Sequence, residues 1–270
     1  MLMRDINLIN SELIELLDDL AADVGDMIKN YPDELMKALE RKIHINKPET
    51  RAAQGKSDKY KCIPHMDILP EWCTDVQDRY DPVGREYLDY MLDISENKSY
   101  KYDQSEICGY PNKEIFLGLT DILAIQAFKD KYKLDKKADK ITYEWLTGNS
   151  RALFGLYPPG GYIPWHNNGN APGYNILMHY SWGGDGSFYS LHDGEIIEYK
   201  DKDRQWLARA GQFLDTSGAG MIGDATETVS QRDASWHAAS TKCWRLTVST
   251  IINHREAWED VVDEMESIDF

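Results

Sequence analysis

The segment CWRLTVSTII, residues 243–252, alternates polar and apolar residues along most of its length, which is the pattern of a half-buried β-strand. Successive side chains of a strand point to opposite faces. One face of this strand would carry Cys243, Arg245, Thr247 and Ser249, and the other would carry Trp244, Leu246 and Val248. The segment NILMHYS, residues 175–181, alternates in the same way and places Asn175 with His179 on one face. We therefore expect two strands with one polar face each, whose apolar faces pack against helices.

Arg245 is the charged residue of the segment 243–252, and a buried charge needs a partner of opposite charge. An isolated arginine inside a small β-barrel is costly, because a buried charge loses its hydration. A guanidinium group can hold a carboxylate through two parallel hydrogen bonds. We therefore expect Arg245 to meet an anionic ligand.

Short segments of strand-like composition recur from Arg151 onward, separated by turn residues. The further strands that we expect are ALFGLY (152–157), GSFYSL (186–191), GEIIEY (194–199), QFLDT (212–216) and AGMIG (219–223). The tripeptide His192-Asp193-Gly194 predicts a hairpin turn between two of them. Many short strands joined by such turns are typical of a sandwich, a jelly roll or a small barrel.

The first ~150 residues have the periodicity of helices instead. Leucine-rich spacing predicts a helix over 11–29 with Ser11 as its N-cap, and Pro32 can occupy the first turn of a second helix. Further helices are expected over 83–94, over 121–132 with Thr120 as the cap, and over 138–147, whereas the polar residues 46–60 predict a loop. The resulting organisation is α+β, with a helical region at 1–150, a β core at 151–255 and a C-terminal helix or tail at 256–270.

The charge and hydropathy of the chain limit its partners. A net charge of −16 over 270 residues argues against nucleic-acid partners and against anionic lipid surfaces. No apolar run is long enough for a membrane-spanning helix, and the acidic N-terminus lacks the features of a signal peptide. We therefore expect a cytoplasmic protein, and a microbial or a virus-encoded origin fits this pattern equally well.

The cysteines agree with a reducing compartment, because Cys62, Cys73, Cys108 and Cys243 form neither a CxxC motif nor a dense framework. Cys62, His65 and Cys73 lie near one another in sequence and are candidate zinc ligands. Their spacings match no common zinc pattern and a fourth ligand is not evident, so scattered thiols in a loop are the favoured interpretation.

Two histidines stand beside tryptophans in strand-like contexts, His166 in YIPWHNN (162–168) and His237 in SWHAAS (235–240). Arg245 follows about one strand after the second histidine, and Thr247 follows two residues later. This order resembles the ligand order of the Fe(II)/2-oxoglutarate-dependent oxygenase superfamily, in particular its prolyl-hydroxylase-like and aspartyl/asparaginyl-hydroxylase-like members. The resemblance covers residues 151–253 and implies a double-stranded β-helix core, that is, a jelly-roll or cupin-like fold.

The resemblance also implies an activity and the residues that carry it. It implies hydroxylation of a peptide, amino-acid or small-molecule substrate, with O2 and 2-oxoglutarate consumed and succinate and CO2 released. Fe(II) would be bound by His166, Asn168 and His237, and the distal carboxylate of 2-oxoglutarate by Arg245 and Thr247. His179 corresponds to a histidine that contacts the co-substrate in the aspartyl/asparaginyl-hydroxylase-like members. Asn175 and Tyr157 complete the expected co-substrate site.

Asn168 departs from the pattern, because most of the superfamily has a carboxylate at that position. Three interpretations remain open at this point: Asn168 binds iron through its carbonyl oxygen, the metal is held by two histidines and water, or the site does not turn over. The third defines the alternative function, a catalytically degenerate cupin-like binding or structural protein. Asp185 and Glu195 are the remaining candidate carboxylates, and we expect both to be exposed on hairpins.

Overall fold

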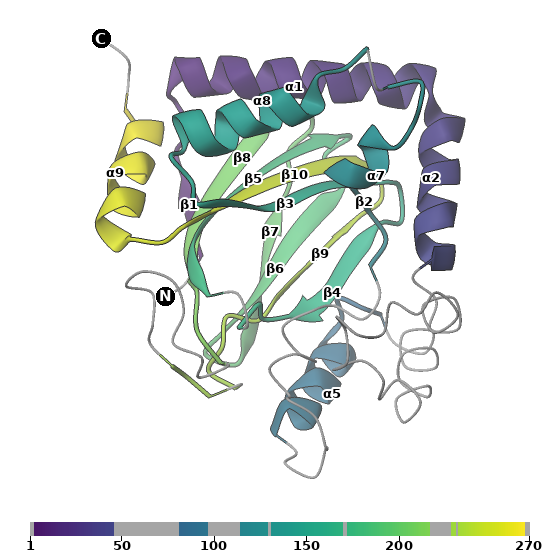
Figure 1. The fold of residues 1–270 in the computed structure, drawn as a ribbon. Coiled ribbons are helices and arrows are strands. Elements are labelled where there is room, and N and C mark those ends of the chain that lie inside the picture. Colours follow the sequence, from purple (N-terminus) through teal and green to yellow (C-terminus); the bar gives the residue numbers. More distant parts are fainter. Residues whose placement is uncertain are drawn as a thin grey trace.

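The computed structural model describes residues 3–45, 81–96, 114–128, 131–169, 172–216, 228–230 and 232–267. Its architecture is α+β, with two antiparallel sheets and a layer of helices on the larger sheet (Figure 1). In spatial order the larger sheet contains β1 (Arg4–Ile6), β8 (Trp206–Phe213), β5 (Gly173–Trp182), β10 (Trp244–Ile252), β3 (Ser150–Tyr157) and β2 (Leu117–Gly118). The smaller sheet contains β4 (Tyr162–His166), β9 (His237–Thr241), β6 (Gly186–His192) and β7 (Glu195–Lys200).

The larger sheet has the two faces that alternation predicts. β10 pairs with β5 so that Arg245 lies opposite Ser181 and Thr247 opposite His179, which joins the polar faces of the two strands. The apolar faces are confirmed as the side that packs against helices. Met178 and Leu246 belong to one core cluster with Leu17 and other buried residues of the N-terminal helices.

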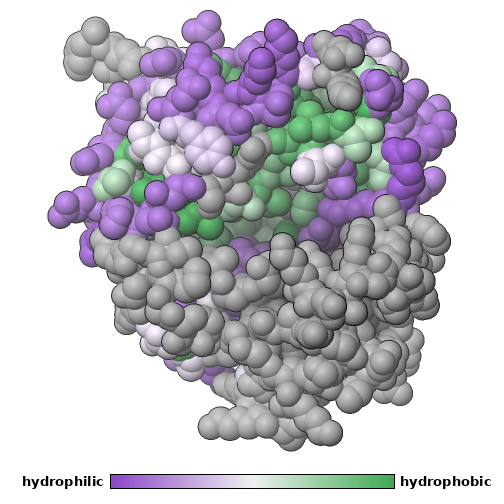
Figure 2. Space-filling model, viewed as in Figure 1, coloured by the Kyte–Doolittle hydropathy of each residue, from purple (hydrophilic) through white to green (hydrophobic). Residues whose placement is uncertain are grey.

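The helices that form this layer come mostly from the N-terminal half. They are α1 (Ser11–Asn30), α2 (Pro32–Ile45), α7 (Leu119–Leu123), α8 (Leu134–Asp139), the π-helical turn Lys140–Trp145 and the C-terminal α9 (Arg255–Met265). In Figure 1, α1 and α8 run across the larger sheet, with α2 and α9 at its two sides. Figure 2, in the same view, shows hydrophilic side chains along the top and sides of the coloured upper part and hydrophobic residues gathered near its centre.

A second layer lies between the two sheets. Tyr157 and Leu177 of the larger sheet form a cluster there with Ile163, Phe188 and Ala239 of the smaller sheet. The outer face of the smaller sheet is covered by α5 (Arg85–Glu96), which contacts β4. The space between the sheets is therefore the interior into which the polar face of β5 and β10 points.

Several predicted elements are confirmed and several are wrong. The strands expected at 152–157, 175–181, 186–191, 194–199 and 243–252 are present as β3, β5, β6, β7 and β10. The hairpin turn is also present, with Asp193 (φ 48°) and Gly194 (φ 81°) in the left-handed region that such turns require. The strand expected over 212–216 is wrong, because β8 begins at Trp206, where pairing with β5 overrides the charged sequence before it.

The observed helix boundaries differ from the predicted ones where tertiary contacts determine them. The N-cap of α1 is Asn10 rather than Ser11: its Oδ1 accepts from the Leu13 N–H (3.1 Å), and its amide donates to the Glu264 carbonyl (3.3 Å). The helix predicted over 121–132 ends at Leu123, and α7 begins after Gly118, whose N–H donates to Asp121. The packing of the Phe128 ring between Tyr31 and Tyr132 holds the following residues in turns.

The helix expected over 138–147 instead divides into α8 and the π-helical turn. The loop at 46–60, the strand at 219–223, and Cys62, His65, Cys73 and Cys108 lie outside the described residues. Within the described ranges, no helix combines the length and the apolar character that crossing a membrane requires.

Candidate metal and anion site between the sheets

His166 and His237 meet inside the smaller sheet. His166 is the last residue of β4 and His237 the first of β9, and the two are paired in register. Their ring centroids lie 4.1 Å apart, and both side chains are buried. The register of β4 shifts between Ile163 and His166, and irregularities of this kind commonly redirect a side chain next to a functional site.

The hydrogen bonds of the two rings fix which nitrogen carries the proton. His166 Nδ1 lies 2.7 Å from the Pro164 carbonyl oxygen, and His237 Nδ1 lies 2.8 Å from that of Ser235. A carbonyl oxygen only accepts, so each Nδ1 is the protonated nitrogen and each Nε2 keeps its lone pair. A backbone carbonyl on one nitrogen and a free lone pair on the other is the usual arrangement of a metal-binding histidine.

The electrostatic environment keeps both rings neutral. Burial lowers the pKa of His166 to about 4. Burial also lowers the pKa of His237 well below its usual value, and the neighbouring His166 lowers it further. At neutral pH both Nε2 atoms are therefore available as ligands without first losing a proton.

The side chain of Asn168 also lies beside the histidine pair. Its Nδ2 lies 3.3 Å from His237 Nε2, and its backbone is in the left-handed region (φ 52°), which asparagine tolerates better than most residues. A side-chain amide can be turned about its axis so that the oxygen replaces the nitrogen. Asn168 therefore can present either a donor to His237 or a carbonyl oxygen to a cation.

Among the described residues, no carboxylate joins this group. Within the described residues, no set of three or more His, Cys, Asp and Glu side chains is arranged to hold a metal ion. Asp185 and Glu195 are both exposed, as expected. The ligand set that these residues offer is thus two neutral imidazoles and one amide, which fits a divalent transition metal such as Fe(II) or Zn(II) better than a hard, oxygen-seeking cation.

Arg245 lies deeper between the sheets and is not the isolated cation expected. Its Nε donates to Asp201 Oδ2 at 2.6 Å, and both side chains are about fully buried (1% and 2% exposed). Its Nη1 donates to the Thr247 hydroxyl at 2.7 Å. Asp201 was missed in the sequence because it follows the exposed Lys200 and precedes Lys202 and Asp203, a composition typical of a solvated loop.

A glycine makes room for this ion pair. A Cβ atom added to Gly186 would lie 2.5 Å from Asp201 Oδ2 and 3.2 Å from Arg245 Cδ. The Gly186 carbonyl also accepts from the Asp201 N–H at 2.8 Å. The close approach of Asp201 to Arg245 therefore depends on the missing side chain at position 186.

Thr247 links the arginine to His179. The Thr247 hydroxyl lies 3.1 Å from His179 Nδ1 and accepts from Arg245, which leaves its own proton available to donate to Nδ1. In that tautomer His179 carries its proton on Nε2, which has no hydrogen-bond partner among the described residues. Burial lowers the pKa of His179 well below its usual value, and the positive charge of Arg245 lowers it further. His179 is thus a neutral ring that presents one N–H to the interior.

The remaining predicted contacts also face this interior. The Asn175 amide is fully buried and neither its oxygen nor its nitrogen has a partner among the described residues. Tyr157 lies opposite Arg245 in the sheet, and the guanidinium carbon is 5.6 Å from the centre of its ring. Burial raises the pKa of Tyr157, so it stays a neutral phenol.

One aromatic ring stands between the histidine pair and the Arg245 group. Phe188 stacks on His237 on one side and on His179 on the other, with ring centroids 5.8 Å apart in each case. His237 is also stacked on Phe213 at 4.6 Å. The structure thus brings His166, Asn168 and His237 together, and it gathers Arg245, Thr247, His179 and Tyr157 in a neighbouring group.

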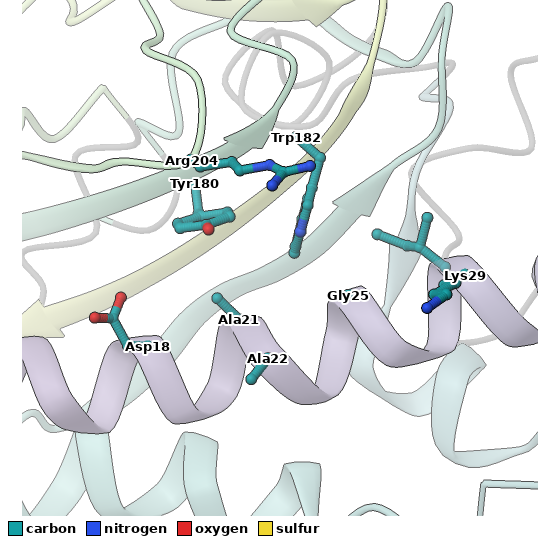
Figure 3. A pocket seen from close by; sticks show the side chains of 9 residues that line it. Asp18, Ala21, Ala22, Gly25, Lys29, Tyr180, Trp182 and Arg204 are labelled. Carbon is teal, nitrogen blue, oxygen red and sulfur yellow. The ribbon is translucent and has the colours of Figure 1, made fainter.

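Two surface grooves lie elsewhere. One has a volume of about 610 Å³ and runs between α1 and β5, where Tyr180, Trp182 and Arg204 face Asp18 and Gly25 (Figure 3). Tyr180 and Trp182 alternate with His179 and Ser181 along β5, so this groove is on the opposite side of the sheet from the histidines. The other groove, of about 660 Å³, lies between α5 and the β6–β7 hairpin.

No family model matches the chain, and no curated protein matches it either. Among solved structures, it is similar to the crystal structure of a predicted oxalate decarboxylase from Thermotoga maritima, with 17% sequence identity and a TM-score of 0.21. The similarity covers 41% of this chain and 75% of that chain. A structural similarity this weak carries no information about function, so the residues of the site are the basis for the function proposed below.

Proposed function

We propose that this chain is an Fe(II)- and 2-oxoglutarate-dependent oxygenase that hydroxylates a peptide, amino-acid or small-molecule substrate and releases succinate and CO2. The observation that carries the proposal is the pair of buried imidazoles, His166 and His237, whose Nε2 atoms both keep a lone pair, that of His237 accepting from the Asn168 amide. Donors for a carboxylate lie in the same interior, on Arg245 and His179.

The strand order supports the corresponding fold. β3, β5, β8 and β10 lie in the larger sheet in the order β8-β5-β10-β3, and β4, β6, β7 and β9 lie in the smaller in the order β4-β9-β6-β7. Eight antiparallel strands divided between two packed sheets fit the composition of a jelly roll. In that fold both histidines and Arg245 come from strands of one core. His166 and Arg245 could therefore serve one site although they are 79 positions apart in the sequence.

Each residue would have a definite task. His166 and His237 would hold the metal, and Asn168 would contribute its carbonyl oxygen or leave that place to water. A bound Fe(II) would supply the O2 and one-electron chemistry that side chains cannot perform. Arg245 and Thr247 would bind the distal carboxylate of 2-oxoglutarate, with Asp201 fixing the orientation of the guanidinium. The buried Phe188 and Phe213 would keep water from the histidine pair.

A second candidate is favoured by one specific observation. Arg245 already has an anionic partner in Asp201, and no carboxylate accompanies the two histidines among the described residues. Both features fit a cupin-like binding or structural protein that kept the core and lost turnover. This candidate predicts no stoichiometric metal and no change in melting temperature on addition of 2-oxoglutarate.

The test is release of succinate by the full chain incubated with Fe(II), ascorbate, O2 and 2-oxoglutarate, followed by NMR. We expect slow release even without the true substrate, a loss of at least tenfold in His237→Ala and in Arg245→Ala, and no change in His192→Ala. His192 is the matched control because it is an exposed histidine at the end of β6. Unchanged release in Arg245→Ala, or no iron bound by the wild type, would sink the proposal.

A further inference from the structure

A second arginine lies in the interior between the sheets and takes no part in the motif described so far. Arg209 is on β8, where it pairs with Leu177 of β5, so its side chain shares the inner face with Asn175 and His179. It is 2% exposed. The guanidinium carbon sits 4.8 Å above the centre of the Tyr199 ring, which comes from the smaller sheet. Arg209 therefore spans the space between the two sheets.

Arg209 is poorly neutralised, in contrast to Arg245. Asp5 Oδ1 is 3.0 Å from Arg209 Nε, but this carboxylate is 71% exposed at the sheet edge and is not aligned as a hydrogen-bond acceptor. Neither Nε nor Nη1 of Arg209 makes a hydrogen bond within the described residues. Of the two buried aspartates among the described residues, Asp201 is paired with Arg245, and Asp215 accepts from the Thr228 hydroxyl. The charged group paired with Arg209 is therefore the exposed Asp5. Burial lowers the pKa of Arg209, yet arginine remains charged in proteins.

Other donors without partners among the described residues lie on the same inner face as Arg209. His179 Nε2, Arg245 Nη2 and the Asn175 amide nitrogen also lack partners among the described residues, and all come from the inner face of the same sheet. Buried polar atoms of folded proteins are nearly always hydrogen-bonded, so a cluster of unsatisfied donors points to a group that binds there. A guanidinium with neighbouring N–H donors matches the two oxygens of a carboxylate.

We propose that Arg209 is a carboxylate-binding residue of the interior, which with His179 and Asn175 holds a carboxylate that the Arg245–Asp201 pair does not neutralise. The carboxylate could belong to a dicarboxylate co-substrate or to an amino-acid substrate, and the two differ in the number of carboxylates they carry. Assigning it to the co-substrate rests on the proposed function, whereas the binding of a carboxylate by Arg209 does not.

The experiment uses the full chain freed of metal with a chelator, so that no metal-bound carboxylate contributes. Binding of succinate, 2-oxoglutarate and N-acetylglycine is measured by calorimetry and by the shift in melting temperature. We expect at least one of these carboxylates to bind the wild type and Arg209→Met to bind it at least tenfold more weakly. Arg204→Met is the matched control, since Arg204 is an exposed arginine in the groove of Figure 3, and its affinity should stay within twofold of the wild type.

Arg209→Lys keeps the charge and loses the planar fork, so it should bind more weakly than the wild type and more tightly than Arg209→Met. Binding of the dicarboxylates alone identifies the co-substrate, and equal binding of N-acetylglycine identifies the substrate carboxylate. Unchanged affinity in Arg209→Met, an equal loss in Arg204→Met, or no binding of any of the three to the wild type overturns the inference. A chain that binds succinate through Arg209 but produces none with Fe(II) would refute the proposed oxygenase and leave this inference standing.

Discussion

The two faces of the larger sheet are built from alternate residues of the same strands, yet they differ in how completely their side chains are satisfied. On the helix-covered face, Ile176 and Met178 of β5 and Leu246 and Val248 of β10 are fully buried in one apolar cluster. Side chains of this kind need only contact and volume, and the helices above supply both.

The face toward the smaller sheet is buried just as deeply but is polar. Asn175, His179, Arg209 and Arg245 all have side-chain nitrogens without a partner among the described residues. Each such group costs free energy of folding, because it loses water and gains nothing in exchange. The comparison teaches that one face stabilises the fold, whereas the other retains unsatisfied groups that become useful only when something binds.

The largest effect on stability is expected for Asp201, the buried carboxylate that neutralises Arg245 on the polar face. Asp201→Ala should lower the free energy of unfolding by about 3–5 kcal/mol, because it leaves the buried Arg245 charge without its carboxylate. The additional substitution Arg245→Met should restore most of that loss, since it removes the orphaned charge. Chemical denaturation of the single and double variants measures both effects.

Asp203→Ala is the control for this pair, because Asp203 is an exposed aspartate two residues along the chain. It should change the free energy of unfolding by less than about 0.5 kcal/mol. If Asp201→Ala proved no more harmful than Asp203→Ala, the ion pair would not be the element that holds Arg245 in place.

The helix-covered face should respond to loss of volume alone. Met178→Ala should lower the free energy of unfolding by about 3 kcal/mol, the typical cost of truncating a fully buried methionine. Carboxylate binding to the folded variant should stay within twofold of the wild type, because Met178 points away from Arg209 and His179. A binding loss as large as that of Arg209→Met would mean that the two faces are not independent.

Much of this contrast was predictable from sequence. Alternation predicts the polar face of each strand, His179 with Asn175 in 175–181 and Thr247 with Arg245 in 243–249, because the period of a strand is two residues. The pairing of β5 with β10 joins these two faces. The order of His166, His237 and Arg245 likewise indicated one site, and the structure brings the two histidine rings into contact.

Asp201 and Arg209 were not predictable, for a physical reason. Both lie in YKDKDRQWLARAG, where a high density of charge suggests solvent exposure. Their burial depends on which strands β8 pairs with and on the missing side chain at Gly186, and neither is a local property. The cap of α1 was missed for the same reason, since the choice of Asn10 over Ser11 depends on its bond to α9.

The smallest expected effect, taken for a change of one pH unit, concerns the protons of the buried histidines. His166 has a pKa of about 4 when folded and about 6.5 when unfolded, because burial disfavours its charged form. Between these values the unfolded chain binds a proton that the native chain does not, so the free energy of unfolding of the metal-free protein falls as the pH is lowered from 6.5 to 4. The contribution of His166 is about 1.4 kcal/mol for each pH unit within that window.

The histidine contribution is separated from that of the carboxylates by comparing variants in denaturant titrations at several pH values. His166→Asn cannot take up this proton, so its free energy of unfolding should depend on pH less steeply than that of the wild type, by about 1.4 kcal/mol per unit. His192→Asn, at the exposed end of β6, should leave the slope unchanged. Equal slopes in the wild type and His166→Asn would show that His166 is not held neutral, and its Nε2 would then not be free for a metal at neutral pH.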